Sequence, residues 1–232
     1  GLKAGDRVAL CMENCPDYVA IWVGLAKVGV VTALVNTHLE GESLKHCLAI
    51  SDATHVITGP HQDRAVCSVT AGMENAPKVW TLGGAHGEDI AAMMPNLSSE
   101  RPSRELRAQL RGKDMCLLIY TSGTTGMPKV GQHKHSGMIY NGWLGHRMLF
   151  NENDTLICPL PLFHVFAAYP ILMSVLASGA HVVFPTPAGY RGDGVFDNFW
   201  KLVERWKVTF VITVPTAIAA LMQRPVDADV SS

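Results

Sequence analysis

The chain has 232 residues, a formal net charge of −1, 48% hydrophobic residues and 17% charged residues. Its basic residues are scattered, so there is no electrostatic argument for nucleic acid as a partner. The charged share lies below the roughly 25% of an average soluble domain. It fits a mostly buried α/β core, or a fragment whose partner surfaces are missing, in one large domain or two small ones.

In the first part of the chain, short β-rich runs alternate with helical patterns, which predicts a mainly parallel sheet covered by helices. Pro16 suits the first turn of the first helix and Gly29 its end. Strands are expected at residues 7–12, 30–35, 54–58 and 78–82, and helices at residues 16–28, 42–50 and 62–74. Residues 83–112, rich in glycine, proline and charge, are expected to form a surface connection with one or two short helices.

The α/β pattern resumes after this connection, so residues 1–112 and 113–232 are interpreted as two α/β portions of one domain. Strands are expected at residues 115–121, 155–159, 181–184 and 208–214, and helices at residues 135–150, 166–177, 195–206 and 215–222. The two longest apolar stretches are each interrupted by a proline and fall short of the ~20 residues that span a bilayer. Peripheral membrane contact stays open.

The six cysteines are predicted to be reduced core residues, because none form a C-x-x-C pair and several lie in apolar runs. This pattern is typical of a cytosolic protein. His133 and His135 alternate without a cysteine or acidic partner nearby, so no metal site is predicted within the chain.

The most informative segment, residues 121–129, follows directly on the strand expected at residues 115–121 and is called the hydroxyl-rich loop below. Its hydroxyl groups can donate hydrogen bonds, its two glycines permit close backbone approach and Lys129 adds a charge. These features suit a polyphosphate, and ligands of open α/β sheets bind where strands end. The glycine spacing differs from that of the common phosphate-binding loop. The alternative is an ordinary polar turn between a strand and a helix.

In the order of its residues, the hydroxyl-rich loop resembles the signature of the adenylate-forming superfamily, which includes acyl-CoA synthetases, luciferase-like enzymes and peptide-synthetase adenylation domains. The resemblance implies a mainly parallel α/β fold that is an incomplete N-terminal domain of such an enzyme. It also implies that the loop holds the β- and γ-phosphates of ATP, with Thr124 and Lys129 catalytic. The implied ATP-binding residues are Thr121, Ser122, Gly123, Thr124, Thr125, Gly126 and Lys129.

A second segment, residues 159–164, resembles the PLPLFH segment of the same superfamily. The resemblance implies that His164 lies near the reacting carboxylate, as a catalytic and substrate-binding residue, with Phe163 and Phe166 beside the acyl chain. The alternative for His164 is a hydrogen-bonded core histidine at a strand end. Further segments that resemble superfamily members lie at residues 5–8, 14–16, 24–29, 35–37 and 211–216. Their residue order is most similar to that of fatty-acyl-CoA synthetases.

Two departures from the superfamily pattern stand out. Val130-Gly131 follow Lys129, where superfamily members more often have glycine directly after the lysine. The adenine-binding, ribose-binding and C-terminal lysine segments are not found, so the chain is expected to be part of a longer enzyme and inactive alone.

The implied reaction joins a fatty acid to CoA through an acyl-adenylate, with ATP giving AMP and pyrophosphate. The Mg²⁺ ligands would lie mostly outside this chain. The alternatives are an adenylation domain that loads a carrier protein, a luciferase-like enzyme, and a non-catalytic nucleotide- or partner-binding module. Homo-oligomer formation stays open, as do the identity of the acid and any membrane association of a cytoplasmic enzyme.

Overall fold

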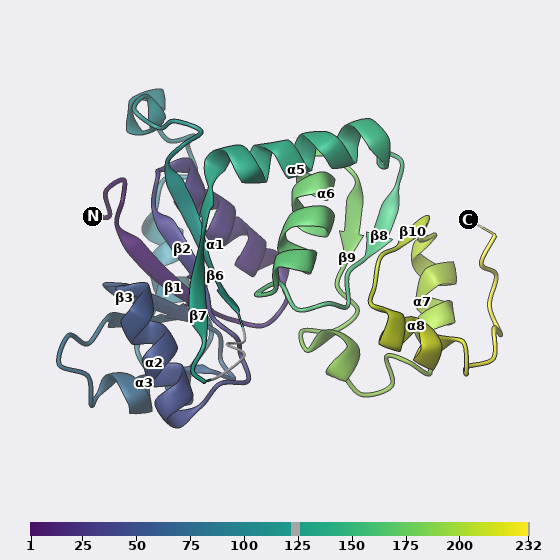
Figure 1. Ribbon diagram of the computed structural model, residues 1–232, viewed down its shortest axis with the longest axis horizontal. Helices are drawn as coiled ribbons and strands as arrows, with labels where there is room; N and C mark the ends of the chain where they lie inside the picture. The colour runs from purple at the N-terminus through teal and green to yellow at the C-terminus, as the bar shows by residue number, and fades with distance from the viewer. Residues whose placement is uncertain (122–125, 232) are drawn as a thin grey trace. The chain divides into compact units, whose positions relative to one another are not determined.

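The computed structural model describes residues 1–121 and 126–231 and divides into two compact units, Gly1–Ser136 and Gly137–Ser232. Figure 1 labels the helices and strands of both units. The sequence predicts a boundary between two α/β portions after residue 112, and this boundary stays a prediction. In the structure, the sheet of the first unit continues past that point, because the strand that follows it pairs with an earlier strand.

The first unit is built on a sheet whose described strands have the order β5-β4-β3-β1-β2-β6-β7. Every neighbouring pair is parallel except β6 and β7, which confirms the predicted mainly parallel α/β fold. The strands are β1 (Arg7–Cys11), β2 (Val31–Leu34), β3 (His55–Thr58), β4 (Lys78–Thr81), β5 (Glu88–Asp89), β6 (Met115–Thr121) and β7 (Lys129–Lys134).

Three helices cover this sheet: α1 (Pro16–Lys27), α2 (Gly41–Ser51) and α3 (Asp63–Thr70). The chain moves from β1 to β2 in one direction along the sheet and from β2 to β3 in the other. Right-handed crossovers therefore place α1 on one face, and α2 and α3 on the opposite face. The core under α2 and α3 joins Leu44, Leu48 and Val66 of these helices to apolar strand residues such as Ala33 and Leu118.

The ends of α1 follow the local sequence as predicted. The Cys15 sulfur accepts a hydrogen bond from the Tyr18 backbone N–H at 3.4 Å, and Pro16 occupies the first turn, where its missing N–H costs nothing. Gly29 ends the helix with φ +80°, a conformation that glycine adopts without strain. Cys15 therefore acts as a helix cap.

The other cysteines are mainly core residues, as predicted, and all six are free. Cys11, Cys47, Cys116 and Cys158 are buried, and burial raises the pKa of Cys47 to about 11 and those of the other three to about 12. These thiols stay protonated at neutral pH and behave as small apolar groups.

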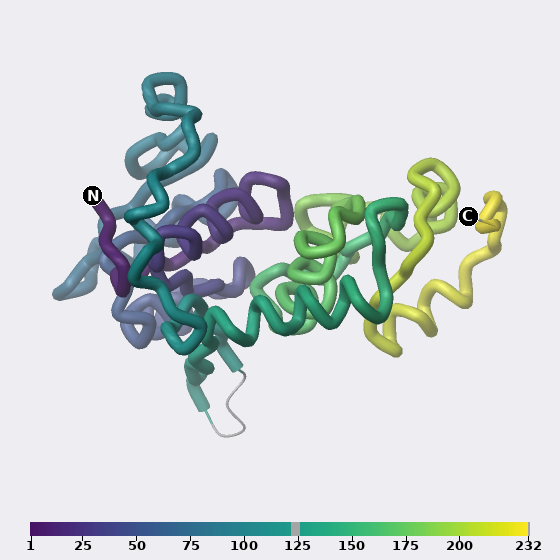
Figure 2. Tube along the Cα trace, turned by 90° about the horizontal axis from the view of Figure 1, so that it is seen from above, coloured from purple at the N-terminus to yellow at the C-terminus, as the bar shows by residue number. Residues whose placement is uncertain are grey.

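The connection after β4 contains β5, the short helix α4 (Ile90–Met93) and the 3₁₀ turns η1 (Met94–Asn96) and η2 (Arg104–Arg107). Residues 91–109 are exposed, and both views show the blue-green part of this segment standing away from the sheet (Figures 1 and 2). The predicted surface connection is therefore present, with a short edge strand in addition.

Strand β7 was not predicted from the sequence. It pairs antiparallel with β6, with Thr121 opposite Lys129 and Tyr120 opposite Val130. The hydroxyl-rich loop therefore connects two strands of a hairpin, and β7 lies between the loop and the helix expected from residue 135. Residues 129–134 are mostly polar and include a glycine, so they carry little local strand signal. Pairing with β6 determines their conformation.

The second unit has a parallel sheet with the order β10-β8-β9, formed by β8 (Thr155–Ile157), β9 (His181–Val183) and β10 (Phe210–Val211). Its helical segments are α5 (His135–Met148), η3 (Ala167–Met173), α6 (Ser174–Ser178), η4 (Gly189–Arg191), α7 (Phe199–Trp206) and α8 (Pro215–Leu221). Strand β10 and helix α7 are shorter than predicted. The core gathers Ile157, Val183, Phe199, Val203, Val208 and Leu221.

The helix expected at residues 166–177 is interrupted by Pro170. Proline lacks the N–H that an α-helix needs and crowds the preceding turn. The chain responds with the π-helical segment η3 around Pro170 before α6 resumes the α conformation. In the described part of the chain, none of the helices is both long and apolar enough to cross a bilayer.

Candidate functional site

The hydroxyl-rich loop leaves the carboxyl end of β6, at the position where the sequence predicts it. Thr121 is the last residue of β6, Lys129 is the first residue of β7, and the two are paired across the hairpin. The predicted binding residues Ser122, Gly123, Thr124 and Thr125 lie outside the described residues. The structure therefore describes the two ends of the predicted site.

The described ends of the loop include an exposed cation and an exposed glycine. Lys129 is exposed and its side chain makes no ion pair with the part of the chain that the structure describes. Gly126 is also exposed, and no described atom lies within 4 Å of the place where its Cβ would be. Glycine is the residue type that lets a phosphate group approach the backbone closely.

Helix α2 holds the loop at both of its ends. The Tyr120 hydroxyl donates a hydrogen bond to the Cys47 carbonyl oxygen at 2.7 Å. The His46 Nε2 lies 2.9 Å from the Pro128 carbonyl oxygen. Tyr120 directly precedes the loop, but His46 lies 82 residues away from Pro128 along the chain, so sequence reasoning gave no signal for it.

The second predicted segment follows β8 in the second unit. The His164 backbone N–H donates to Pro161, and its carbonyl oxygen accepts from Ala168 at the start of the following helix. His164 is exposed, which differs from the alternative of a core histidine. Its ring lies 4.7 Å from that of Phe163, measured between centroids. Phe163 is only 6% exposed, whereas Phe166 is 38% exposed.

The segment that carries His164 and residues 214–216 share one edge of the second sheet. They follow β8 and β10, which are parallel neighbours. Helix α8 begins at Pro215, directly after this edge. Open α/β sheets bind ligands at the carboxyl ends of their parallel strands. The segment that carries His164 lies at this edge of the second sheet, and the hydroxyl-rich loop leaves the corresponding edge of the first sheet.

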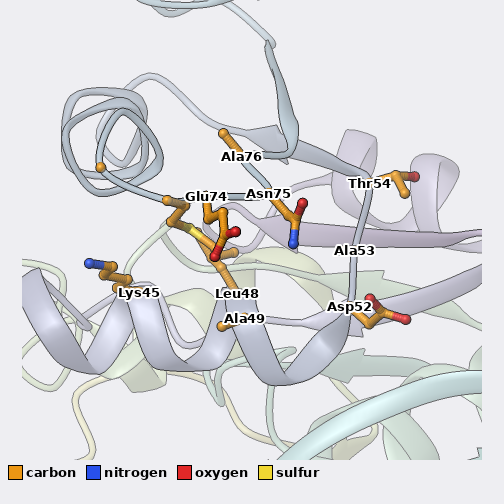
Figure 3. Close-up of a pocket in the computed structure, with 11 residues that line it drawn as sticks. Lys45, Leu48, Ala49, Asp52, Ala53, Thr54, Glu74, Asn75 and Ala76 are labelled. Atoms are coloured by element: carbon orange, nitrogen blue, oxygen red, sulfur yellow. The ribbon is translucent and has the colours of Figure 1, made fainter.

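A surface pocket of about 670 Å³ lies elsewhere in the first unit, beside the C-terminal half of α2. Figure 3 shows Lys45, Asp52, Glu74 and Asn75 around it. It is lined by residues that precede β3 and β4, so it opens at the amino ends of the strands. The hydroxyl-rich loop leaves a carboxyl end, at the opposite edge of the same sheet.

Metal ligands do not gather in the described residues: no group of three or more histidine, cysteine, aspartate or glutamate side chains could hold an ion. We therefore assign no Mg²⁺ ligand to these residues.

Comparison with protein families identifies the family of the chain. The model of the AMP-binding enzymes matches residues 1–232, the whole chain. The chain belongs to the AMP-binding enzyme family. Solved structures agree with this AMP-binding fold. The N-terminal domain of FACL13 from Mycobacterium tuberculosis aligns with a TM-score of 0.83 and 26% identity, over 100% of this chain and 56% of that one. The anthranilate CoA ligase AuaEII, solved with anthranoyl-AMP, has a TM-score of 0.84 at 23% identity, over 97% of this chain and 44% of that one.

Two curated relatives show which members of the AMP-binding family the chain is similar to. The long-chain fatty acid transport protein 1 of Rattus norvegicus is 30% identical, over 97% of this chain and 35% of that protein. The marinolic acid–CoA ligase of Pseudoalteromonas sp. is 29% identical, over 98% of this chain and 36% of that protein. The AMP-binding chain therefore spans about a third of the length of these relatives.

Proposed function

We propose that the chain is the polyphosphate-binding part of an acyl-CoA synthetase. The observation that carries this proposal is the hydroxyl-rich loop at the carboxyl end of β6, with an exposed Lys129 and an exposed Gly126 that has no described atom within 4 Å of its Cβ position. Membership of the AMP-binding family and the named acid–CoA ligases among its relatives support the reaction type. A fatty acid is the proposed substrate, since the relatives include a long-chain fatty acid transport protein.

In the proposed first step, a carboxylate oxygen of the acid attacks the α-phosphorus of ATP. The bond between the α-phosphorus and the bridging oxygen breaks, and pyrophosphate leaves. In the second step, the CoA thiol loses its proton and attacks the acyl carbon, so that AMP leaves with the oxygen that came from the acid. Mg²⁺ would neutralise phosphate charge, with ligands from outside the described residues.

The residues of the hydroxyl-rich loop act mainly on the departing pyrophosphate. Lys129 places a cation, and the hydroxyls of Thr121, Ser122, Thr124 and Thr125 place hydrogen-bond donors, where negative charge grows as the bond breaks. Donors that are already oriented need no rearrangement during the reaction, and one such donor is worth roughly 100- to 1000-fold in rate in well-studied enzymes. Thr124 and Lys129 are the proposed catalytic residues of this group.

His164 is proposed to orient the carboxylate of the acid, and Phe163 and Phe166 to contact the acyl chain. Support comes from the position of His164 after the carboxyl end of β8 and from its exposure. Phe166 is exposed enough to touch a ligand directly, whereas the buried Phe163 packs against the His164 ring and would act through it.

The proposal predicts that Lys129→Ala lowers acid-dependent exchange between ATP and pyrophosphate at least tenfold in the complete protein, because an unneutralised charge remains on the leaving group. Lys134→Ala is the matched control, since Lys134 is the exposed lysine at the other end of β7. Equal exchange rates for the two variants would rule out the assigned role of Lys129. Replacing CoA with a phosphopantetheinyl carrier protein in the second step distinguishes a synthetase from an adenylation domain.

A further inference from the structure

Helix α2 makes two hydrogen bonds to the described ends of the hydroxyl-rich loop, and this pair of contacts is called the brace below. The helix contributes two adjacent residues, His46 and Cys47, that hydrogen bond to opposite ends of the loop: Cys47 to Tyr120, before the loop, and His46 to Pro128, near its end. The distances are 2.7 Å and 2.9 Å, both within the normal range. Two adjacent residues of one helix thus contact the end of β6 and the residue that precedes β7.

The hairpin ladder is the other link between the two described ends of the loop. Pairing of Thr121 with Lys129 sets the distance between the two strands, but the pair sits at the edge of the sheet, where β7 has no further described neighbour. The brace adds contacts from helix α2 to these two ends. Tyr120 and Val130, which are paired across the hairpin, also pack on the core cluster that contains Leu44 and Leu48 of α2.

Both contacts of the brace have a backbone carbonyl oxygen as the acceptor, so the side chain must be the donor in each. A carbonyl oxygen only accepts, so His46 must carry its proton on Nε2, which both the neutral Nε2–H tautomer and the imidazolium allow. Pro128 has no N–H, so its carbonyl is its only backbone hydrogen-bonding group, and His46 satisfies it. Burial raises the pKa of Tyr120 well above its usual value, so its hydroxyl remains a donor.

We propose that His46 and Tyr120 are positioning residues that hold the ends of the hydroxyl-rich loop in the orientation that binds the polyphosphate of ATP. The proposal rests on the proposed function of the loop. A protein that adopts the binding-competent arrangement only part of the time binds its ligand more weakly by that fraction. Loss of the brace therefore weakens the affinity for ATP and leaves the affinity for the carboxylic acid unchanged.

The test compares variants of the complete protein by acid-dependent ATP–pyrophosphate exchange and by calorimetric titration with ATP. His46→Ala and Tyr120→Phe each raise the KM and Kd for ATP about fivefold, the equivalent of one ordinary hydrogen bond. His46→Gln keeps an N–H donor at similar reach and restores the wild-type values to within about twofold. Lys45→Ala, the adjacent position on α2, is the control and leaves ATP affinity unchanged.

The outcomes separate the two proposals. If the wild type exchanges pyrophosphate but His46→Ala and Tyr120→Phe keep its KM and Kd for ATP while losing thermal stability, the brace is structural only and the inference is overturned. If the wild type binds ATP without exchanging pyrophosphate, the proposed reaction is wrong. The calorimetric titrations then still test the brace, because a weaker Kd for ATP in the His46 and Tyr120 variants supports it and an unchanged Kd overturns it. A wild type that neither binds ATP nor exchanges pyrophosphate contradicts both.

Discussion

Asp63 is a charged side chain that the first unit buries almost completely, with only 4% of the residue exposed. Its carboxylate accepts hydrogen bonds from three backbone N–H groups: those of Arg64 at 2.6 Å, Ala85 at 2.7 Å and His86 at 2.9 Å. These bonds connect the start of α3 to the segment after β4. A buried charge is tolerated when it is satisfied in this way.

The pKa of Asp63 reflects the balance of these effects. Burial works to raise it, but the hydrogen bonds from His86, Ala85 and Arg64 favour the charged form and lower it below the usual value. The folded-state pKa therefore lies below the unfolded-state pKa. The resulting stability is fully present above the unfolded pKa of about 4 and is lost as the pH falls through the folded pKa.

We predict that Asp63→Asn lowers the free energy of unfolding at pH 7 by about 2 kcal/mol, because charged hydrogen bonds are lost. The difference from the wild type shrinks as the pH falls below about 4, where the wild-type carboxylate also becomes protonated. Urea unfolding at pH 7 and pH 3 measures both effects, with the exposed Glu74→Gln as the control. A difference that is the same at both pH values would contradict the role of the charge.

At the scale of elements, helix α5 packs closely against α6 and the end of η3 through two glycines. A Cβ on Gly142 would lie 2.9 Å from the Met173 carbonyl oxygen, and one on Gly145 would overlap the side chain of Ser174. The absence of side chains at these positions lets the two helical segments approach. Gly137, in the first turn of the same helix, has only an ordinary contact of 3.9 Å with Tyr169.

Gly145→Ala is therefore expected to destabilise the second unit by about 2 kcal/mol, because overpacking forces the two helical segments apart. Gly137→Ala is the matched control on α5 and changes stability by less than about 1 kcal/mol, since its Cβ fits and alanine favours the helix. Thermal unfolding followed by circular dichroism compares the two. If Gly145→Ala melts at the same temperature as Gly137→Ala, the close packing described for α5 is wrong.

The elements that the sequence predicts well are those with a strong local signal. An apolar β-branched run identified β2, an apolar run identified β6, and Pro16 with Gly29 identified the limits of α1. Strand β7 escaped prediction because its polar residues become a strand only by pairing with β6. The contact of His46 with Pro128 escaped for the related reason that it joins positions 82 residues apart. Tertiary contacts of this kind leave no periodicity in the sequence.

At the scale of the whole molecule, the predicted family and α/β fold are confirmed, and the roles of the individual site residues stay predictions. Among the residues that carry the adenylation proposal, Thr121 ends β6, Lys129 begins β7 and His164 follows the end of β8. Their chemistry follows from residue type and position in the sheet. Selection of the acid depends on side chains that come together only in the folded protein, so a local sequence pattern does not predict it. The chain also covers only about a third of the length of its named relatives.

The most direct test of the central claim follows the oxygen atoms of the acid. The complete protein is incubated with ATP, CoA and a fatty acid labelled with ¹⁸O in its carboxylate, and the nucleotide product is analysed by mass spectrometry. The proposed attack on the α-phosphorus predicts AMP that carries one ¹⁸O atom for each thioester formed. Unlabelled AMP, or ADP in its place, would contradict the account.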